Sequence, residues 1–163
     1  FLIALYLYYF YFLLINIKIE FGEEAILILL ITCMLSDIGG YVTGRLLGGP
    51  KLTKISPNKT ISGAAGSVIF TILGSPMFVY FLKKFDEDSI SFEISAKIYI
   101  WFLMMSIFCQ VGDLLISYLK RKAKVKDTGV MLPGHGGILD RVDGIIFAIP
   151  LGVLAFFLLE LSV

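Results

Sequence analysis

The sequence predicts an all-α, polytopic membrane protein, and three observations support this fold class. Hydrophobic residues make up 58% of the 163 positions, while charged residues make up only 17%. The mean hydropathy is +0.89, far above that of an ordinary soluble domain. Five apolar runs are separated by polar or glycine-rich breaks. Because hydrocarbon offers the backbone no hydrogen-bond partners, runs of this kind are expected to be helices.

Each run is close to the ~20 mainly apolar residues that a spanning helix needs. The five runs cover residues 1–17, 25–47, 61–82, 94–119 and 144–161. The first is already apolar at Phe1 and lacks a starting Met, so we expect N-terminal helices of a larger bundle to precede it. A signal peptide is the alternative for this run. Against it, no basic segment precedes the run and no small-residue cleavage site follows.

The connections between the runs predict how the chain is oriented. Those after the second and fourth runs are basic, and their cationic residues are Arg45, Lys51, Lys54, Lys59, Lys120, Arg121, Lys122, Lys124, Lys126 and Arg141. The other two connections are mainly acidic. Basic connections stay on the cytoplasmic side, so residue 1 is expected inside and the C-terminus outside. In the second run, small residues recur every four positions, which would let another helix approach closely.

Two carboxylates, Asp37 and Asp113, interrupt the apolar runs. An ionised group at such a depth is costly and normally faces a polar interior, a partner or an ion. Each lies roughly 10 to 12 Å along its helix from the next basic residue, so both belong to the cytoplasmic half. Asp140 and Asp143 approach the same surface from the last connection. The sequence therefore predicts four carboxylates that converge beneath one membrane surface.

Asp113, Ser117 and Lys120 or Arg121 follow one another at helical spacing, so they share one face of the fourth run. A carboxylate, a hydroxyl and a cation in line suit a hard cation such as Mg²⁺ with a phosphate above it. The alternative for Asp113 is a buried salt bridge to a neighbouring helix or a protonated structural acid. For Asp140, the alternative role is that of an N-cap or of a favourable contact with the helix dipole.

Residues 117–143 fit the pattern S-x-x-K-R-x4-K-D-x-G-x-x-x-P-G-H-G-G-x-x-D-R-x-D at every fixed position. With this pattern the chain resembles the phosphatidate cytidylyltransferase family. Residues 36–60 are similar, more loosely, to the family's D-x-x-A-Y-x-x-G-R-x-x-G and S-P-x-K-T elements. Gly40, Ser62 and Gly144 depart from the residues that many members carry. The resemblance covers approximately residues 36–150.

The resemblance implies that a phosphate oxygen of phosphatidic acid attacks the α-phosphorus of CTP, giving CDP-diacylglycerol and pyrophosphate. It implies Mg²⁺, with room for a second cation, held by Asp113, Asp140 and Asp143. The implied partners are CTP, phosphatidic acid, the lipid bilayer and a second copy of the chain, with no nucleic acid. We expect one catalytic domain over residues 1–163, a cytoplasmic signature loop at 120–143, and an active site that faces the cytoplasm from the inner membrane.

The candidate catalytic residues are Asp113, Lys120, Arg121, Lys126, Asp140, Arg141 and Asp143. The candidate substrate-binding residues are Asp37, Arg45, Lys59, Thr60, Ser117, His135, Gly136 and Gly137. Arginine can bind phosphate through two hydrogen bonds and lysine as a point charge, and glycines let backbone N–H groups approach a phosphate. For the lysine and arginine side chains, the alternative role is attraction to anionic lipid. For His135, a structural loop role is equally compatible.

Two other functions are alternatives to this interpretation. An ion-coupled transporter also has intramembrane carboxylates, but here the polar groups gather near one surface. A CDP-alcohol phosphotransferase would carry D-G-x2-A-R-x8-G-x3-D-x3-D, which is absent. Cys33 and Cys109 lie in separate apolar runs without a C-x-x-C pattern, so we expect buried thiols and neither a metal cluster nor a disulfide framework.

Overall fold

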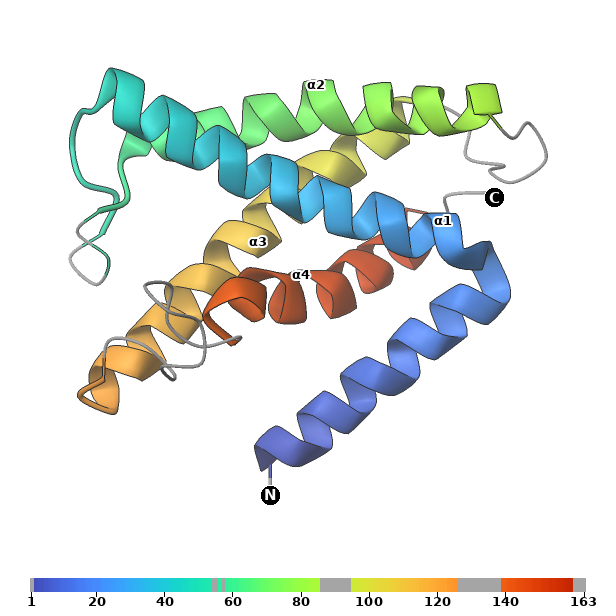
Figure 1. Ribbon diagram of the computed structural model, residues 1–163, viewed down its shortest axis with the longest axis horizontal. Helices are drawn as coiled ribbons and strands as arrows, with labels where there is room; N and C mark the ends of the chain where they lie inside the picture. The colour runs from blue at the N-terminus through green and yellow to red at the C-terminus, as the bar shows by residue number, and fades with distance from the viewer. Residues whose placement is uncertain (1, 54–55, 57, 86–94, 126–138, 160–163) are drawn as a thin grey trace.

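The computed structural model describes residues 2–53, 56, 58–85, 95–125 and 139–159, with the backbone alone for residues 2–3, 85 and 139–143. These residues form four helices without a named strand (Figure 1). The helices are α1 (Leu2–Leu47), α2 (Ile61–Phe85), α3 (Ala96–Lys122) and α4 (Leu139–Leu158). Three of them contain stretches that are long and apolar enough to cross a membrane, and Gly144–Leu158 is a shorter apolar helix. The predicted all-α, multi-pass fold is confirmed.

The first two predicted runs are two helical segments of α1, which meet at a kink. The helix bends at Gly22, whose φ of 84° and ψ of 177° are not helical. A side chain at this position would meet Glu24, because a Cβ would lie 2.6 Å from its Oε2 atom. A positive φ of this size is open mainly to glycine. Lys18 and Glu23 form an ion pair of 2.7 Å across the bend. The five predicted runs therefore correspond to the two helical segments of α1 and to α2, α3 and α4.

The helix ends alternate between two sides of the molecule (Figure 1). The bend of α1, the end of α2, the start of α3 and the end of α4 lie toward the right of the view. The end of α1, the start of α2, the end of α3 and the start of α4 lie toward the left. We call the left side, which carries Lys51, Lys59 and residues 120–122, the basic end. The other side, where Glu20, Glu23 and Glu24 lie at the bend of α1, is called the acidic end.

The last helix begins earlier than the sequence predicts. α4 starts at Leu139, whereas the apolar run begins at residue 144. The additional turn contains Asp140 and Asp143, and acidic residues are stabilised in the first turn of a helix by its dipole. Hydropathy alone misses this turn because it is polar. Both aspartates are thus fixed to the helix backbone at the basic end.

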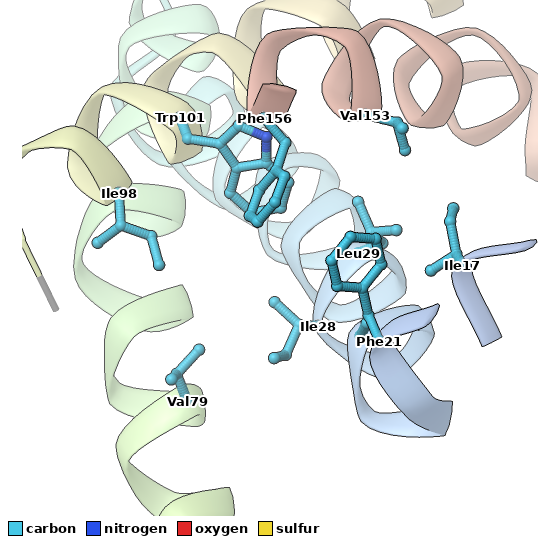
Figure 2. Close-up of a pocket in the computed structure, with 10 residues that line it drawn as sticks. Ile17, Phe21, Ile28, Leu29, Val79, Ile98, Trp101, Val153 and Phe156 are labelled. Atoms are coloured by element: carbon cyan, nitrogen blue, oxygen red, sulfur yellow. The ribbon is translucent and has the colours of Figure 1, made fainter. Parts of the chain in front are cut away.

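The apolar core lies toward the acidic end, where all four helices meet around a small cavity of about 40 Å³ (Figure 2). Phe21 from α1, Val79 from α2, Trp101 from α3 and Phe156 from α4 line it. The rings of Phe21 and Phe156 pack edge to face at 5.6 Å. Buried Trp101 also donates a hydrogen bond of 2.7 Å to the carbonyl of Gly152. This contact ties α3 to α4.

The substitution Trp101→Phe tests how much that hydrogen bond stabilises the core. We expect unfolding to cost about 1 to 3 kcal/mol less, because the buried carbonyl loses a partner and the smaller ring enlarges the cavity. Thermal unfolding of the complete protein in detergent measures the change. The control is Tyr99→Phe, on an exposed position of the same helix. Equal melting temperatures for the two variants would contradict the assigned contact.

Toward the basic end, α1 and α2 approach through small residues. A Cβ on Gly40 would lie 2.5 Å from the Ser67 hydroxyl, and one on Gly63 would lie 2.8 Å from the Gly40 carbonyl. The predicted close approach at Gly40 is therefore present. Cys33 and Cys109 are buried free thiols, as expected, but their sulfurs lie only 3.0 Å apart where α1 crosses α3.

Candidate functional site

The connection between α1 and α2 is held as a short hairpin at the basic end. The Leu52 N–H donates to the Lys59 carbonyl at 2.8 Å, and the Ile61 N–H donates to the Pro50 carbonyl at 3.0 Å. Thr60 caps α2, because its hydroxyl accepts a hydrogen bond of 3.1 Å from the Gly63 N–H. The sequence therefore fixes the backbone of Lys59 and Thr60 directly before a helix N-terminus.

A polar cleft of about 380 Å³ opens between this hairpin and the helices. Its lining includes Asp37 and Tyr41 from α1, Lys59 and Thr60 from the hairpin, and Gln110 and Asp113 from α3. The first residues of α2 also line it. The N-terminus of a helix carries partial positive charge and favours anions. The polar cleft thus combines a helix N-terminus, an ammonium group and two carboxylates.

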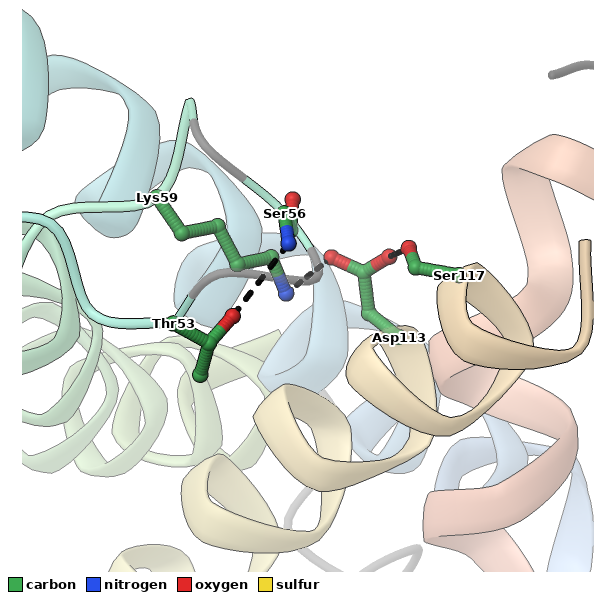
Figure 3. A network of polar contacts seen from close by, with 5 residues as sticks. All are labelled: Thr53, Ser56, Lys59, Asp113 and Ser117. Carbon is green, nitrogen blue, oxygen red and sulfur yellow. Dashed lines mark hydrogen bonds and ion pairs between the residues drawn. The ribbon is translucent and has the colours of Figure 1, made fainter. Parts of the chain in front are cut away.

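Lys59 and Asp113 meet inside the polar cleft (Figure 3). The Lys59 ammonium pairs with Oδ2 of Asp113, and the Ser117 hydroxyl donates to Oδ1 at 3.4 Å. The side chains of Lys59 and Asp113 are 25% and 33% exposed, so water still reaches the pair. The Ser117 contact agrees with the predicted helical face. The Lys59 contact joins the hairpin to α3.

Next to the polar cleft lies a hydrogen-bonded group of buried and partly buried side chains. Ser36 of α1 and Ser106 of α3 lie 3.1 Å apart through their hydroxyls. The Gln110 amide donates to the Ala64 carbonyl at 3.3 Å and lies 3.4 Å from the Ser106 hydroxyl. These contacts hold α1, α2 and α3 together below the cleft. Gln110 and Ser106 were not among the site residues predicted from the sequence, although they precede Asp113 at helical spacing on the same face.

The helix pair α3 and α4 crosses immediately below Asp113. A Cβ on Gly112 would lie 2.7 Å from the Phe147 Cβ and 3.1 Å from the Gly144 carbonyl. A Cβ on Gly144 would lie 3.2 Å from the Cys109 carbonyl. Glycine at both positions lets the backbones touch. Asp113 follows one of these glycines directly, so the crossing brings its backbone close to the first turns of α4.

The other candidate residues are placed as follows. Arg45 donates a hydrogen bond of 2.7 Å to the Tyr41 hydroxyl, and its guanidinium lies 5.9 Å from the Tyr41 ring. Arg121 is exposed and contacts the Val125 carbonyl at 3.5 Å, while Lys120 is half-buried at the end of α3. For Asp140, Arg141 and Asp143 the structure describes the helical backbone alone. Lys126, His135, Gly136 and Gly137 lie outside the described residues.

The donor set of the polar cleft suits a hard cation. Carboxylate and hydroxyl oxygens are the ligands that Mg²⁺ prefers, and Asp113 already holds a cationic group in the form of the Lys59 ammonium. Among the side chains that the structure describes, no three His, Cys, Asp or Glu residues gather into a metal site. Asp140 and Asp143 do not belong to this set, because the structure describes their backbone alone.

Fold and site together define a multi-pass membrane protein with a polar, charge-lined cleft at one end of its helices. A family model described as "Cytidylyltransferase family" matches residues 1–159. The chain therefore belongs to the cytidylyltransferase family. This finding gives the transporter alternative no support.

Several relatives are named phosphatidate cytidylyltransferase. One from Helicobacter pylori is 45% identical over 141 residues, which is 85% of this chain and 50% of that protein. One from Staphylococcus haemolyticus is 42% identical over 136 residues, or 80% of this chain and 48% of that protein. One from Brucella suis is 40% identical over 129 residues, or 78% of this chain and 45% of that protein. The chain spans about half the length of these relatives.

Proposed function

We propose that the protein transfers the cytidylyl group of CTP to phosphatidic acid, forming CDP-diacylglycerol and pyrophosphate. The observation that carries this proposal is the Lys59–Asp113 contact. Lys59 belongs to the S-P-x-K-T element, and Asp113 precedes the long signature pattern and contacts its first residue, Ser117. The contact therefore brings two separate family elements together. The names of the relatives support the same reaction.

In this reaction a phosphate oxygen of phosphatidic acid forms a bond to the α-phosphorus of CTP. The bond between that phosphorus and the oxygen bridging to the β-phosphate breaks, and pyrophosphate leaves with the electron pair. The attacking oxygen is already anionic, so the protein needs no strong base and contributes mainly alignment and charge neutralisation.

The residues of the polar cleft suit these tasks. Lys59 and the N-terminus of α2, capped by Thr60, provide positive charge for the phosphates. Asp113 would hold Mg²⁺ together with Asp140 and Asp143, which the signature pattern assigns to that role. When bound, the cation supplies neutralisation of the negative charge that accumulates between the two phosphates. Ser117 orients the Asp113 carboxylate through its hydrogen bond.

The test uses the complete protein in detergent with CTP that carries a label in either the α- or the γ-phosphate. We expect the α-label to enter lipid and the γ-label to leave as pyrophosphate, both only when phosphatidic acid and Mg²⁺ are present. Chelation should stop both. Pyrophosphate release at the same rate without phosphatidic acid would contradict the proposed acceptor. Unchanged turnover after exhaustive chelation would contradict the proposed cation.

We further propose that the polar cleft faces the cytoplasm from the inner membrane, because its connections are basic and CTP is cytoplasmic. The proposal includes one catalytic domain over residues 1–163 with the signature loop at 120–143. Assembly into a homodimer rests on the family resemblance alone.

The orientation is tested by single cysteines at Lys122, at the basic end, and Glu20, at the acidic end. Both positions are exposed, and the background carries Cys33→Ala and Cys109→Ala. We expect an impermeant thiol reagent to label the Glu20→Cys variant in intact cells and the Lys122→Cys variant only after the membrane is opened, because basic connections stay inside. The reverse pattern would overturn the orientation.

A further inference from the structure

The ion pair between Lys59 and Asp113 engages the carboxylate that the proposed function assigns to a divalent cation. One oxygen of Asp113 contacts the Lys59 ammonium, and the other accepts from Ser117. A divalent cation bound to Asp113 would lie beside the ammonium. Two positive charges at such a separation repel strongly in a partly buried site. The ammonium and the divalent cation therefore compete for one carboxylate.

The hairpin allows the Lys59 side chain to leave without a change in the backbone. Its carbonyl accepts from the Leu52 N–H at 2.8 Å, and its N–H donates to the Ser56 carbonyl at 3.1 Å. Lys51 and Thr60 pair across the hairpin. Lysine has a flexible stem with a mobile ammonium at its tip. Only the side chain has to move, and the polar cleft of about 380 Å³ lies beside it.

The position of Lys59 in the polar cleft determines where its displaced ammonium can go. Lys59 lines the polar cleft next to Thr60 and the start of α2, where the helix dipole favours an anionic group. An ammonium released from Asp113 into this region would add a second attraction for a phosphate. Cation binding at Asp113 would thereby prepare the region beside the start of α2 for the nucleotide.

We propose that Lys59 is a built-in placeholder that occupies the carboxylate of Asp113 until a divalent cation displaces it, and that the released ammonium then binds the phosphates of CTP. Lys59 thus competes with the cation for Asp113 and, once released, is a binding residue for the nucleotide. The inference rests on the proposed function for the identity of the anionic ligand. The competition at Asp113 itself needs neither CTP nor lipid.

The first measurement is binding of Mn²⁺ alone to the complete protein in detergent, followed by electron paramagnetic resonance of the free ion. We expect Lys59→Met to bind Mn²⁺ roughly fivefold more tightly than the unchanged protein, because a partly exposed ion pair competes only modestly. The matched control is Lys51→Met, which removes a charge from the same hairpin at an exposed position outside the pair. It should shift the affinity much less.

Unchanged or weaker Mn²⁺ binding in Lys59→Met, with a melting temperature near that of the unchanged protein, would overturn the proposal. An equal gain in Lys51→Met would also overturn it, because general electrostatics would then explain the effect. Adding Asp113→Asn to Lys59→Met should remove the gain. If the gain persisted, the cation would bind elsewhere and the proposal would fail.

The second measurement is binding of CTP at saturating Mn²⁺. We expect Lys59→Met to bind CTP about tenfold more weakly, since one charge-assisted phosphate contact is lost, while Lys51→Met binds normally. Equal affinity of Lys59→Met and the unchanged protein would overturn the second half of the proposal. A protein that shows the Mn²⁺ competition but never forms CDP-diacylglycerol would refute the proposed function and leave the competition intact.

Discussion

Replacing Asp113 by Asn should lower turnover by on the order of 100-fold or more and leave the fold intact. The amide keeps the shape of the carboxylate but is a poor ligand for a hard cation, and stabilisation of transferred charge is lost. The free energy of unfolding should change by less than about 1 kcal/mol, because the ion pair to Lys59 is partly exposed. Specific activity and melting temperature are measured on the same preparation.

The alternative role of Asp113, a structural salt bridge, makes a different prediction. In the structure the partner in this salt bridge is Lys59. If the pair only holds the hairpin to α3, Asp113→Asn and Lys59→Met should lower the melting temperature equally and retain activity in proportion to folded protein. A control is Glu23→Gln, which removes the carboxylate of the exposed Lys18–Glu23 pair at the acidic end. It should keep normal turnover.

Gly112→Ala should produce the second large effect, by forcing α3 and α4 apart beneath Asp113. The added methyl would lie 2.7 Å from the Phe147 Cβ and 3.1 Å from a backbone carbonyl, neither of which is the flexible end of a side chain. We expect a loss of about 1 to 3 kcal/mol in unfolding free energy. Turnover should fall by as much as about 100-fold, because displacement of a catalytic group by an ångström costs that much.

The matched control for this variant is Gly74→Ala, in the middle of α2. Its methyl would lie 2.9 Å from Cδ1 of Leu35, the movable end of a side chain, and neither residue lines the polar cleft. We expect nearly normal turnover from this control. Equal loss of activity in the two variants would show that overpacking anywhere inactivates the protein, and the crossing at Gly112 would then have no special role.

The sequence predicts the apolar helices well because the membrane leaves few alternatives for a long apolar run. It also places Asp113 and Ser117 correctly on one helical face, since their spacing is local. It places a break between the first two runs, where the non-helical Gly22 lies, but it does not predict that a single residue makes the kink. Likewise, the polar first turn of α4 carries no hydropathy signal.

The contacts that assemble the polar cleft are long-range, and for this reason they could not be derived from spacing. The sequence proposes Lys59 as a phosphate ligand, but its pairing with Asp113 depends on how the hairpin folds back onto α3. The helical spacing between Gln110 and Asp113 could have indicated from the sequence that both lie on one face of α3. Its contact with the Ala64 carbonyl follows only from the packing of α2 against α3.

The most direct test of the central claim is to map where the nucleotide binds. The complete protein is irradiated with a photoreactive CTP analogue and Mg²⁺, and the modified peptides are identified by mass spectrometry. We predict that the label falls on the hairpin around Lys59 or the first turn of α2, and that unlabelled CTP suppresses it. Competed labelling confined to the acidic end, around the bend at Gly22, would contradict the assignment of the polar cleft as the active site.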